Sequence, residues 1–251
     1  MKTALFFLCL TASTLTHAQY TLSDGQSVVG RGLWSENVAG ISHSTDYALG
    51  ISNDYAFGLS ELSTSKISVV APLNFGVLNA NWSNRGDALY SENELALSFA
   101  RHFSSFFQLG MRFRLNSTAV NHETQSVFLA DIGMQSAITN QLSFGVELEN
   151  PFRADLQSTS LEIGVAYWLS EKASLFLSTR KESDLPTSVI MHINYSLLEK
   201  VSFHAALSNT AFFNRFAVSY RLKGLSLELF LSHHSYLGFS PQVGISYTFG
   251  K

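Results

Sequence analysis

Charge, cysteine and long apolar runs are all scarce in this sequence. Only 14% of the 251 residues are charged, and the formal net charge is −3. About a quarter of the residues of a typical soluble domain are charged. No basic footprint is present, so the composition predicts no nucleic-acid partner. A soluble protein of this length would normally carry more charge than this chain does.

The single cysteine, Cys9, lies in an apolar stretch near the N-terminus. Residues 1–18 are typical of an export signal, with Lys2 as the basic start, residues 4–10 as the apolar core and Thr-His-Ala as the end. We expect cleavage between Ala18 and Gln19. The mature chain would then lack cysteine, and neither disulfides nor thiolate metal sites would be available to it.

After the signal, no run of eighteen apolar residues occurs, which excludes a membrane-spanning helix. Phe and Tyr are abundant instead, at 20 and 9 residues. In residues 239–249 the odd positions are large and apolar, whereas the even positions are small and polar. Only a strand with two unlike faces fits this period of two. At about 3.3 Å per residue and a tilt of roughly 45°, it would cover about 25 Å, the height of the apolar band of an outer-membrane barrel.

Similar alternation recurs along most of the chain. Apolar faces fall within residues 67–71, 74–82, 95–99, 107–115, 128–134, 142–148, 161–169, 175–177, 189–197, 201–207, 216–222, 225–231 and 239–249, of which 74–82 is the least regular. These thirteen strands need one more before them if the last is to end in the periplasm, and residues 44–52 can supply it.

The predicted fold is therefore an all-β transmembrane antiparallel up-and-down barrel of about 14 strands over residues 44–251. Twelve strands is the alternative, if neither 44–52 nor 74–82 forms a strand. Residues 19–43 would form an N-terminal segment in the periplasm or in the lumen. Short links such as 104–105 and 139–140 alternate with longer polar ones such as 83–92 and 116–123. Short periplasmic turns and longer external loops are typical of outer-membrane barrels.

The faces opposite to the apolar ones carry charged residues, which we expect to point into the lumen. They are Glu94, Arg112, Arg114, Asp131, Glu147, Glu149, Glu162, Arg180, Arg215, Arg221 and Glu228. An Arg or Lys facing lipid at the midplane would cost about 2–4 kcal/mol, so this sorting is physically required. Two roles are open, a permeation path or solute site and a structural network. Because both signs occur on neighbouring strands, the network is the favoured interpretation.

No constellation in the sequence indicates catalysis or a cofactor. A nucleophile needs a base and an orienting group, and periodicity brings no Ser, His and acid together convincingly. We expect replacement of His102, His192 and His204 to leave any lipid hydrolysis intact. The chain is therefore predicted to be non-enzymatic and to need no cofactor or metal, with an outer-membrane barrel enzyme acting on lipid as the alternative.

Three stretches resemble a known family. They are Gly-Leu-Ser-Glu-Leu at 58–62, Glu-Leu-Glu-Asn-Pro-Phe at 147–152 and the final segment 234–249. Together with the export signal and many short strands, they resemble the FadL-like barrels of Bacteroidota, particularly the PorV/PorQ type. The resemblance implies a fourteen-stranded outer-membrane barrel with an N-terminal segment inside. The functions of that family range from uptake of hydrophobic solutes to assistance of type IX secretion.

These observations predict a barrel in the outer membrane of a Gram-negative bacterium. It would either pass small hydrophobic solutes or serve as an accessory of type IX secretion or surface attachment. Its expected partners are outer-membrane lipid and either a hydrophobic small solute or proteins of the secretion machinery.

Overall fold

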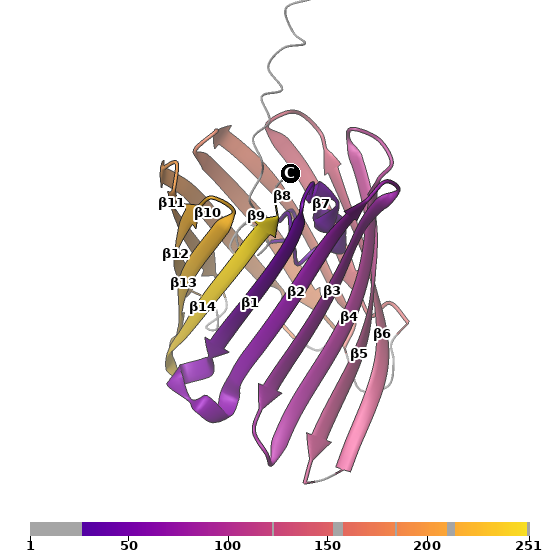
Figure 1. The fold of residues 1–251 in the computed structure, drawn as a ribbon, viewed down its shortest axis with the longest axis vertical. Helices are drawn as coiled ribbons and strands as arrows, with labels where there is room; N and C mark the ends of the chain where they lie inside the picture. The colour runs from indigo at the N-terminus through magenta and orange to yellow at the C-terminus, as the bar shows by residue number, and fades with distance from the viewer. Residues whose placement is uncertain (1–26, 122, 153–157, 184, 210–213, 250–251) are drawn as a thin grey trace, which may run out of the picture.

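The computed structural model describes residues 27–121, 123–152, 158–183, 185–209 and 214–249. The export signal and its cleavage site at Ala18 and Gln19 lie outside these residues. Fourteen strands of the described chain form one closed antiparallel barrel, in which each strand pairs with its neighbours in the chain and β1 pairs with β14 (Figure 1). The predicted fold class and the count of 14 are confirmed.

The strands follow one another with little between them. They are β1 (Tyr47–Tyr55), β2 (Ser63–Leu73), β3 (Gly76–Gly86), β4 (Tyr90–His102), β5 (Phe107–Val120), β6 (Glu123–Ala137), β7 (Leu142–Glu149), β8 (Ser160–Ser170), β9 (Ala173–Glu182), β10 (Ser188–Leu198), β11 (Val201–Ser208), β12 (Asn214–Leu222), β13 (Leu225–His234) and β14 (Gly238–Phe249). Three short 3-10 helices complete the elements, η1 (Val38–His43), η2 (Ala56–Gly58) and η3 (Ser60–Leu62). Among the described residues, no helix is long and apolar enough to cross a membrane.

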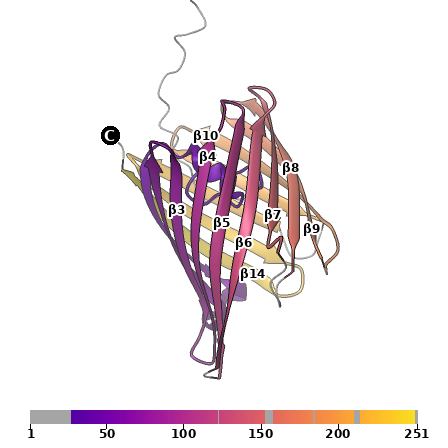
Figure 2. The ribbon, with the colours of Figure 1, turned by 90° about the vertical axis from the view of Figure 1, so that its right-hand side faces the viewer.

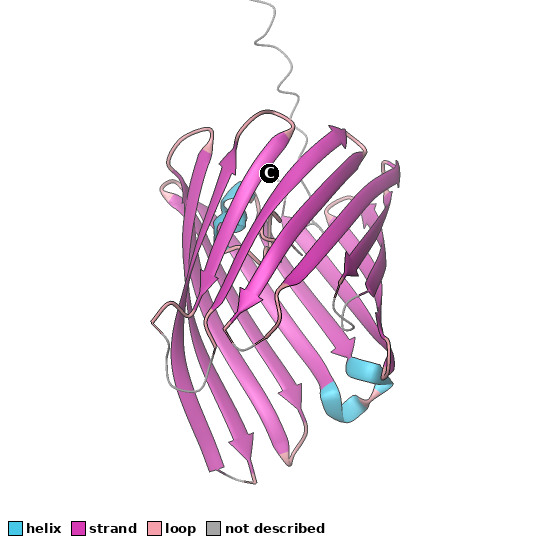
Figure 3. Cartoon of the chain, turned by 180° about the vertical axis from the view of Figure 1, so that it is seen from behind, coloured by secondary structure: helices cyan, strands magenta, loops and turns pink. Residues whose placement is uncertain are grey.

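The two ends of the barrel differ in their connections. We call the end at which β14 finishes the turn end; it carries the links between β2 and β3, β4 and β5, and so on to β12 and β13. The opposite end, the loop end, carries η2 and η3 between β1 and β2. Figure 3 shows η1 inside the ring of strands near the turn end, and the other two helices at the loop end.

The apolar face of each strand points outward. In β4, Leu95 and Leu97 are exposed, the latter by 58%, whereas Ala96 and Ser98 between them are buried at 1% and 3%. An outer wall of this kind would be unfavourable in water, and it suits contact with hydrocarbon. The small and polar face therefore lines the interior, as the alternation predicts.

The loop-end connections are shorter than the sequence suggests. Residues 83–92 and 116–123 were expected to be loops, but β3 continues to Gly86, β4 begins at Tyr90 and only residues 121–122 separate β5 from β6. The interstrand ladder continues here with polar side chains on its outer face. Figure 2 shows β3–β6 reaching well beyond the rest of the wall. The polar residues here mark the end of the apolar band, whereas the strands themselves continue beyond it.

Asp87 holds the short turn between β3 and β4. Its carboxylate accepts hydrogen bonds from the backbone N–H groups of Leu89, at 2.9 Å, and Tyr90, at 3.1 Å. These bonds favour the ionised form, with that from Tyr90 contributing most, and lower the pKa of Asp87. A charged, well-bonded turn residue thus closes the extended strands at their tip.

Two strand boundaries also differ from those predicted from the sequence. The first strand, expected at 44–52, spans Tyr47–Tyr55. The apolar faces predicted at 67–71 and 74–82 imply a link at Pro72 and Leu73. The link lies two residues later, at Asn74 and Phe75, because Pro72 still pairs with Val77 and Leu73 with Gly76. Both shifts are small, and neither changes the face on which a side chain points.

Candidate functional site: the lumen and its plug

Residues 27–46 lie inside the barrel, and we call them the plug. Their apolar side chains are almost completely buried, with Val28 and Val29 at 1% exposure and Val38 at 0%. Val38 and Ile41 of η1 pack against Ala100 of β4. η1 of the plug therefore lies against β3–β6, near the turn end (Figures 1 and 2).

Glycines make room for this close approach. Four of them line neighbouring strands beneath the plug: Gly110, Gly133, Gly145 and Gly164. Gly110 lies opposite Gly133, and Gly145 opposite Gly164, in the strand register. A Cβ on Gly133 would lie 2.1 Å from Oδ1 of Asn37, and one on Gly145 would lie 2.3 Å from the carbonyl oxygen of Val28. The glycine row thus lets backbone meet backbone, which any larger residue would prevent.

Asn37 is the polar anchor of the plug. Its side-chain amide donates to the carbonyl oxygens of Val28 at 2.7 Å, Met134 at 3.0 Å and Val146 at 3.0 Å. Its Oδ1 accepts from the backbone N–H of Ala39 at 2.9 Å and so caps η1. Asn37 is fully buried. One side chain therefore ties Val28 and the start of η1 to β6 and β7.

Gln135 of β6 makes a second link between wall and plug. Its side-chain amide donates to the carbonyl oxygen of Gly30 at 2.8 Å and to that of Val28 at 3.2 Å. A buried carbonyl without a partner is costly. By supplying the missing donors, Gln135 and Asn37 make the irregular backbone of the plug stable inside the barrel.

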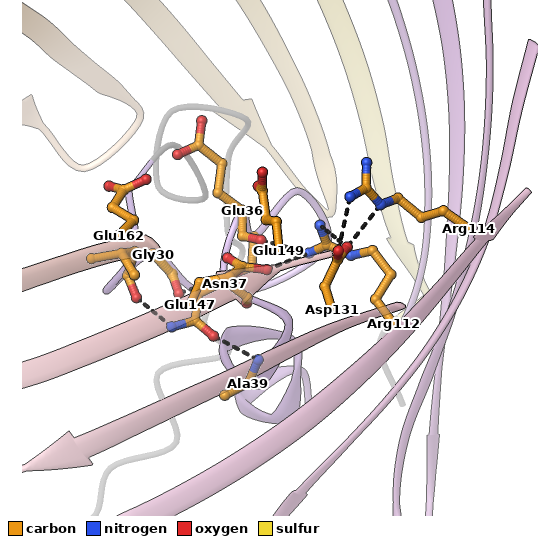
Figure 4. A network of polar contacts seen from close by, with 12 residues as sticks. Gly30, Glu36, Asn37, Ala39, Arg112, Arg114, Asp131, Glu147, Glu149 and Glu162 are labelled. Carbon is orange, nitrogen blue, oxygen red and sulfur yellow. Dashed lines mark hydrogen bonds and ion pairs between the residues drawn. The ribbon is translucent and has the colours of Figure 1, made fainter. Parts of the chain in front are cut away.

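Charged residues surround the plug on the same side of the lumen. Asp131, with no exposed surface, pairs with Arg114, whose Nε lies 2.8 Å from Oδ2 and whose Nη2 donates to Oδ1 at 2.8 Å. Arg112 lies 3.8 Å from Asp131 and 3.5 Å from Glu147, and it also donates to the backbone carbonyl of Glu36. Figure 4 shows both arginines reaching Asp131, with Glu147 and Glu149 beside them.

A second ion-pair group adjoins the first. Arg180 of β9 lies 2.8 Å from Glu149 and 3.8 Å from Glu162, and Glu162 faces Glu147 across the β7 and β8 pair. Glu94 joins the first group through Arg114, at 3.4 Å. The structure thus brings together eight of the eleven charged residues that were predicted to line the lumen. Each of the three arginines pairs with two of the five carboxylates, which favours a network that holds the wall and the plug together.

The other three predicted residues lie across the lumen. Arg215 of β12 donates from Nε to Oγ of Ser232 at 2.9 Å, and Arg221 donates to Oγ of Ser202 at 3.0 Å. Glu228 of β13 is 2% exposed. These residues come from β12 and β13, whereas the ion pairs around Asp131 and Arg180 join residues of β4–β9.

Aromatic residues line the wall from the turn-end half of β8 round to β13. Val28 and Val29 of the plug pack against Ala166 and Phe176, with Trp168 beside them. Trp34 of the plug packs on Ala217 and Phe230. The guanidinium of Arg31 lies 4.4 Å from the centre of the Trp168 ring, in a cation–π contact. The plug therefore meets the far wall through apolar and aromatic surfaces.

A cavity of about 230 Å³ remains between the plug and this wall. Its lining includes Val29, Arg31, Trp168, Phe176, His204 and Arg221. Glu171 and Lys172, which form the link between β8 and β9, are also part of the lining and place the cavity at the turn end. The space combines two aromatic side chains, Trp168 and Phe176, with the guanidinium groups of Arg31 and Arg221 and with several serine hydroxyls.

The histidines serve as hydrogen-bonding groups of the interior. His102 reaches the carbonyl oxygen of Ser42 at 3.0 Å and so steadies η1. His204 stands 2.9 Å from Oδ1 of Asn194 and 3.4 Å from Oγ of Ser219, an alignment across β10, β11 and β12 that periodicity did not reveal. Ser219 has no exposed surface. Within the described residues, no three His, Cys, Asp or Glu side chains form a metal site.

The glycine row and Asn37 were missed by sequence reasoning. Each glycine occupies an inward position of a strand, which the alternation indicates, but their alignment depends on the register of four strands. Asn37 lies in a segment without periodicity. No local pattern there distinguishes an anchor from any other polar residue.

Known structures share this architecture. No protein-family model matches the sequence, and no curated protein is similar to it in sequence. A deletion mutant of the TodX monoaromatic hydrocarbon channel superposes with a TM-score of 0.69 at 11% identity, covering 91% of this chain and 100% of that one. A Pseudomonas aeruginosa FadL homologue gives 0.67 at 9% identity, covering 93% and 96%. The CymD monoaromatic hydrocarbon channel gives 0.61 at 10%, covering 91% and 97%.

At these identities the likeness establishes the fold alone. The chain has the architecture of outer-membrane channel barrels, and FadL-family transporters are among the structures that it resembles.

Proposed function

We propose that this chain is a non-enzymatic channel of the Gram-negative outer membrane that passes small hydrophobic solutes. The observation that carries the proposal is the division of the lumen. A plug is fastened to one wall by glycines, Asn37 and ion pairs, and a cavity of about 230 Å³ with aromatic residues in its lining remains at the other. Structures of this fold include channels named for monoaromatic hydrocarbons.

Export is part of the proposal. Residues 1–18 would direct the chain across the inner membrane, and cleavage between Ala18 and Gln19 would release it. The apolar outer wall would then meet outer-membrane lipid as its first partner. Heat-modifiable migration of the protein from outer-membrane fractions, with Gln19 at its N-terminus, is the expected result. A soluble periplasmic protein would contradict it.

Transport is best tested in cells, because small hydrocarbons cross simple phospholipid vesicles unaided. A Gram-negative host without its own hydrocarbon channel would express the chain, and the initial uptake of radiolabelled toluene would be measured. Ser174 is buried and lines the cavity, whereas Leu175 points to the outer face. Ser174→Trp should fill the cavity and reduce uptake to that of cells without the protein. Leu175→Trp is the matched control, and equal uptake by both variants would refute the route.

An accessory role in type IX secretion or surface attachment is the second candidate. It rests on the resemblance to the PorV/PorQ type and on the β3–β6 strands, which extend beyond the rest of the wall. Affinity purification of the cross-linked protein from its own cells would distinguish the two. Secretion components without solute uptake would favour the accessory role, and uptake without such components would favour the channel.

An enzyme acting on lipid is the least supported alternative. Asn194, His204 and Ser219 form a hydrogen-bonded row, but the hydroxyl of Ser219 is buried inside the barrel wall. A lipid substrate would have to reach that hydroxyl from the bilayer. Phospholipid hydrolysis that disappears in Ser219→Ala would overturn the assignment as a non-enzyme.

A further inference from the structure

Among the described residues, the loop-end part of β6 has an edge without a paired strand. β6 begins at Glu123, but its pairing with β7 begins only at Asp131, opposite Glu149. Asn150 turns the chain away with a φ of 48°, and Pro151 has no N–H to donate. Within the described residues, positions 123–129 of β6 therefore pair with β5 alone.

The direction of the backbone groups follows from the ladder. The N–H of Ala137 donates to the carbonyl of Phe106 on the β5 side, at 2.8 Å. In an antiparallel pair the bonded residues alternate, so the odd residues of β6 bond to β5 and the even ones point the other way. The carbonyl of Ala130 agrees, because it accepts from Asn150 at 3.0 Å. Thr124, Ser126 and Phe128 thus turn their N–H and C=O groups to the open edge.

Thr124 and Ser126 of this edge lie beyond the apolar band of the outer wall, and Phe128 lies at its border. Trp82, Leu95, Leu115 and Phe128 face one another across β3–β6 and form the last apolar row. The next outward row is polar. In it, Asn84 donates to Asn93 at 2.8 Å, and the hydroxyls of Ser117 and Ser126 lie 2.7 Å apart. Polar side chains on the outer face indicate contact with water, so the end of the extension projects from the membrane.

The edge also lacks the usual protection against pairing. Natural edge strands carry lysine, proline or a bulge, any of which discourages an added strand. Residues 123–129 read Glu-Thr-Gln-Ser-Val-Phe-Leu, and their register with β5 is unbroken. Glu123 is the single charged residue among them. The edge is regular, uncharged along most of its length and open to a further strand.

We propose that Thr124, Ser126 and Phe128 form a docking site at which another protein adds an extended strand, antiparallel to β6. The main-chain bonds would supply affinity, and the neighbouring side chains would select the sequence. Because the edge is nearly uncharged, the partner segment would be an uncharged strand of Thr, Val and Ser type, with any basic residue next to Glu123.

A second copy of this chain does not fit the site. Two barrels in one membrane have the same orientation across it, so their β6 strands run in the same sense. Antiparallel pairing of the two edges would require one barrel to be inverted. An occupant that pairs antiparallel to β6 is therefore a strand of a different protein, outside the membrane.

Amide exchange on the mature full-length protein in micelles tests the site. The probe is the peptide Lys-Thr-Val-Thr-Val-Thr-Val-Lys, added to isotopically labelled protein and followed by NMR. We expect the amides of Thr124, Ser126 and Phe128 to exchange freely without peptide and to become protected with it. Those of Gln125 and Val127, bonded to β5, should be protected throughout. Protection of all five without peptide, or no change at saturating peptide, would refute the proposal.

A substitution at Ser126 provides the second arm. Ser126→Pro removes one edge N–H and leaves the bonds to β5, a placement that proline tolerates on edge strands. Peptide binding should weaken by roughly tenfold or more. Ser126→Ala loses the contact with Ser117 but retains the N–H, and it should bind as the parent does. Equal binding by the proline variant, with heat-modifiable migration retained, would exclude this edge as the site.

Discussion

The plug is held in different ways by the two sides of the lumen. On the β5–β8 side it lies on bare backbone at four glycines, its carbonyls accept side-chain amides, and buried ion pairs surround it. From the turn-end half of β8 round to β13 it touches aromatic and aliphatic surfaces and leaves a cavity. The first set of contacts is directional and intolerant of change, whereas the second is adaptable.

In the proposed channel, this difference would combine a fixed plug with a passage for the solute. Directional hydrogen bonds and buried charges are costly to break, so they determine where the plug sits. Apolar contact has no preferred direction, so a solute can replace part of it. We therefore expect substitutions on the two sides to have unequal effects on stability and unequal effects on transport.

The largest effect is expected at the buried carboxylate. Asp131→Asn removes the charge that compensates Arg112 and Arg114, and breaking a buried pair from one side costs about 3–5 kcal/mol. Denaturant unfolding in micelles, followed by tryptophan fluorescence, would measure this loss in the free energy of unfolding. Glu149→Gln is the control, because Glu149 is one-quarter exposed and partly exposed pairs contribute less, about 1 kcal/mol or below. Equal losses of unfolding free energy in Asp131→Asn and Glu149→Gln would contradict the special role of the buried carboxylate.

Gly133→Val tests the close approach of the plug. Its side chain would overlap Asn37, and overpacking of this kind costs about 1–3 kcal/mol. If the plug leaves the wall, single-channel conductance in planar bilayers should rise. Ala80→Val, on the exposed outer face of β3, should change neither stability nor conductance. Unchanged conductance in Gly133→Val would mean that the plug has another anchor.

Asn37→Ala tests the polar anchor itself. It leaves the carbonyls of Val28, Met134 and Val146 without this donor and uncaps η1, at an expected cost of about 1–3 kcal/mol. Hydrogen exchange of residues 38–43 should become faster. Ser42→Ala, which loses one bond within η1, should cost about 1 kcal/mol. If hydrogen exchange of residues 38–43 is equally fast in the two variants, Asn37 does not determine where the plug lies.

The smallest effect on stability is expected on the aromatic side. Trp168→Ala removes the ring beneath Arg31, a contact of about 0.5–1 kcal/mol at a partly exposed site. Hydrogen exchange in η1 should stay as in the parent, while uptake of radiolabelled toluene should change. A loss of stability as large as that of Asp131→Asn would show that both sides hold the plug alike.

The outer wall and the strand count could be predicted because alternation is a local property. The residues of β14 specify two faces by themselves, and the odd number of strands after residue 66 requires one more before it. Loop lengths could not be predicted in the same way. At Asn84, Asn93, Ser117 and Ser126 the strands continue with polar side chains, since pairing depends on the neighbouring backbone and not on hydropathy.

The sequence by itself determined which face of each strand meets lipid, the class of fold, and that mixed charges line the inside. The tertiary structure alone decided which of those charges pair, where the plug lies and which edge is open. Those features depend on the register between strands and on a segment without periodicity. Gly110 and Gly133 become neighbours only when β5 and β6 align, and Asn37 becomes an anchor only when the carbonyls of β6 and β7 are placed beside it.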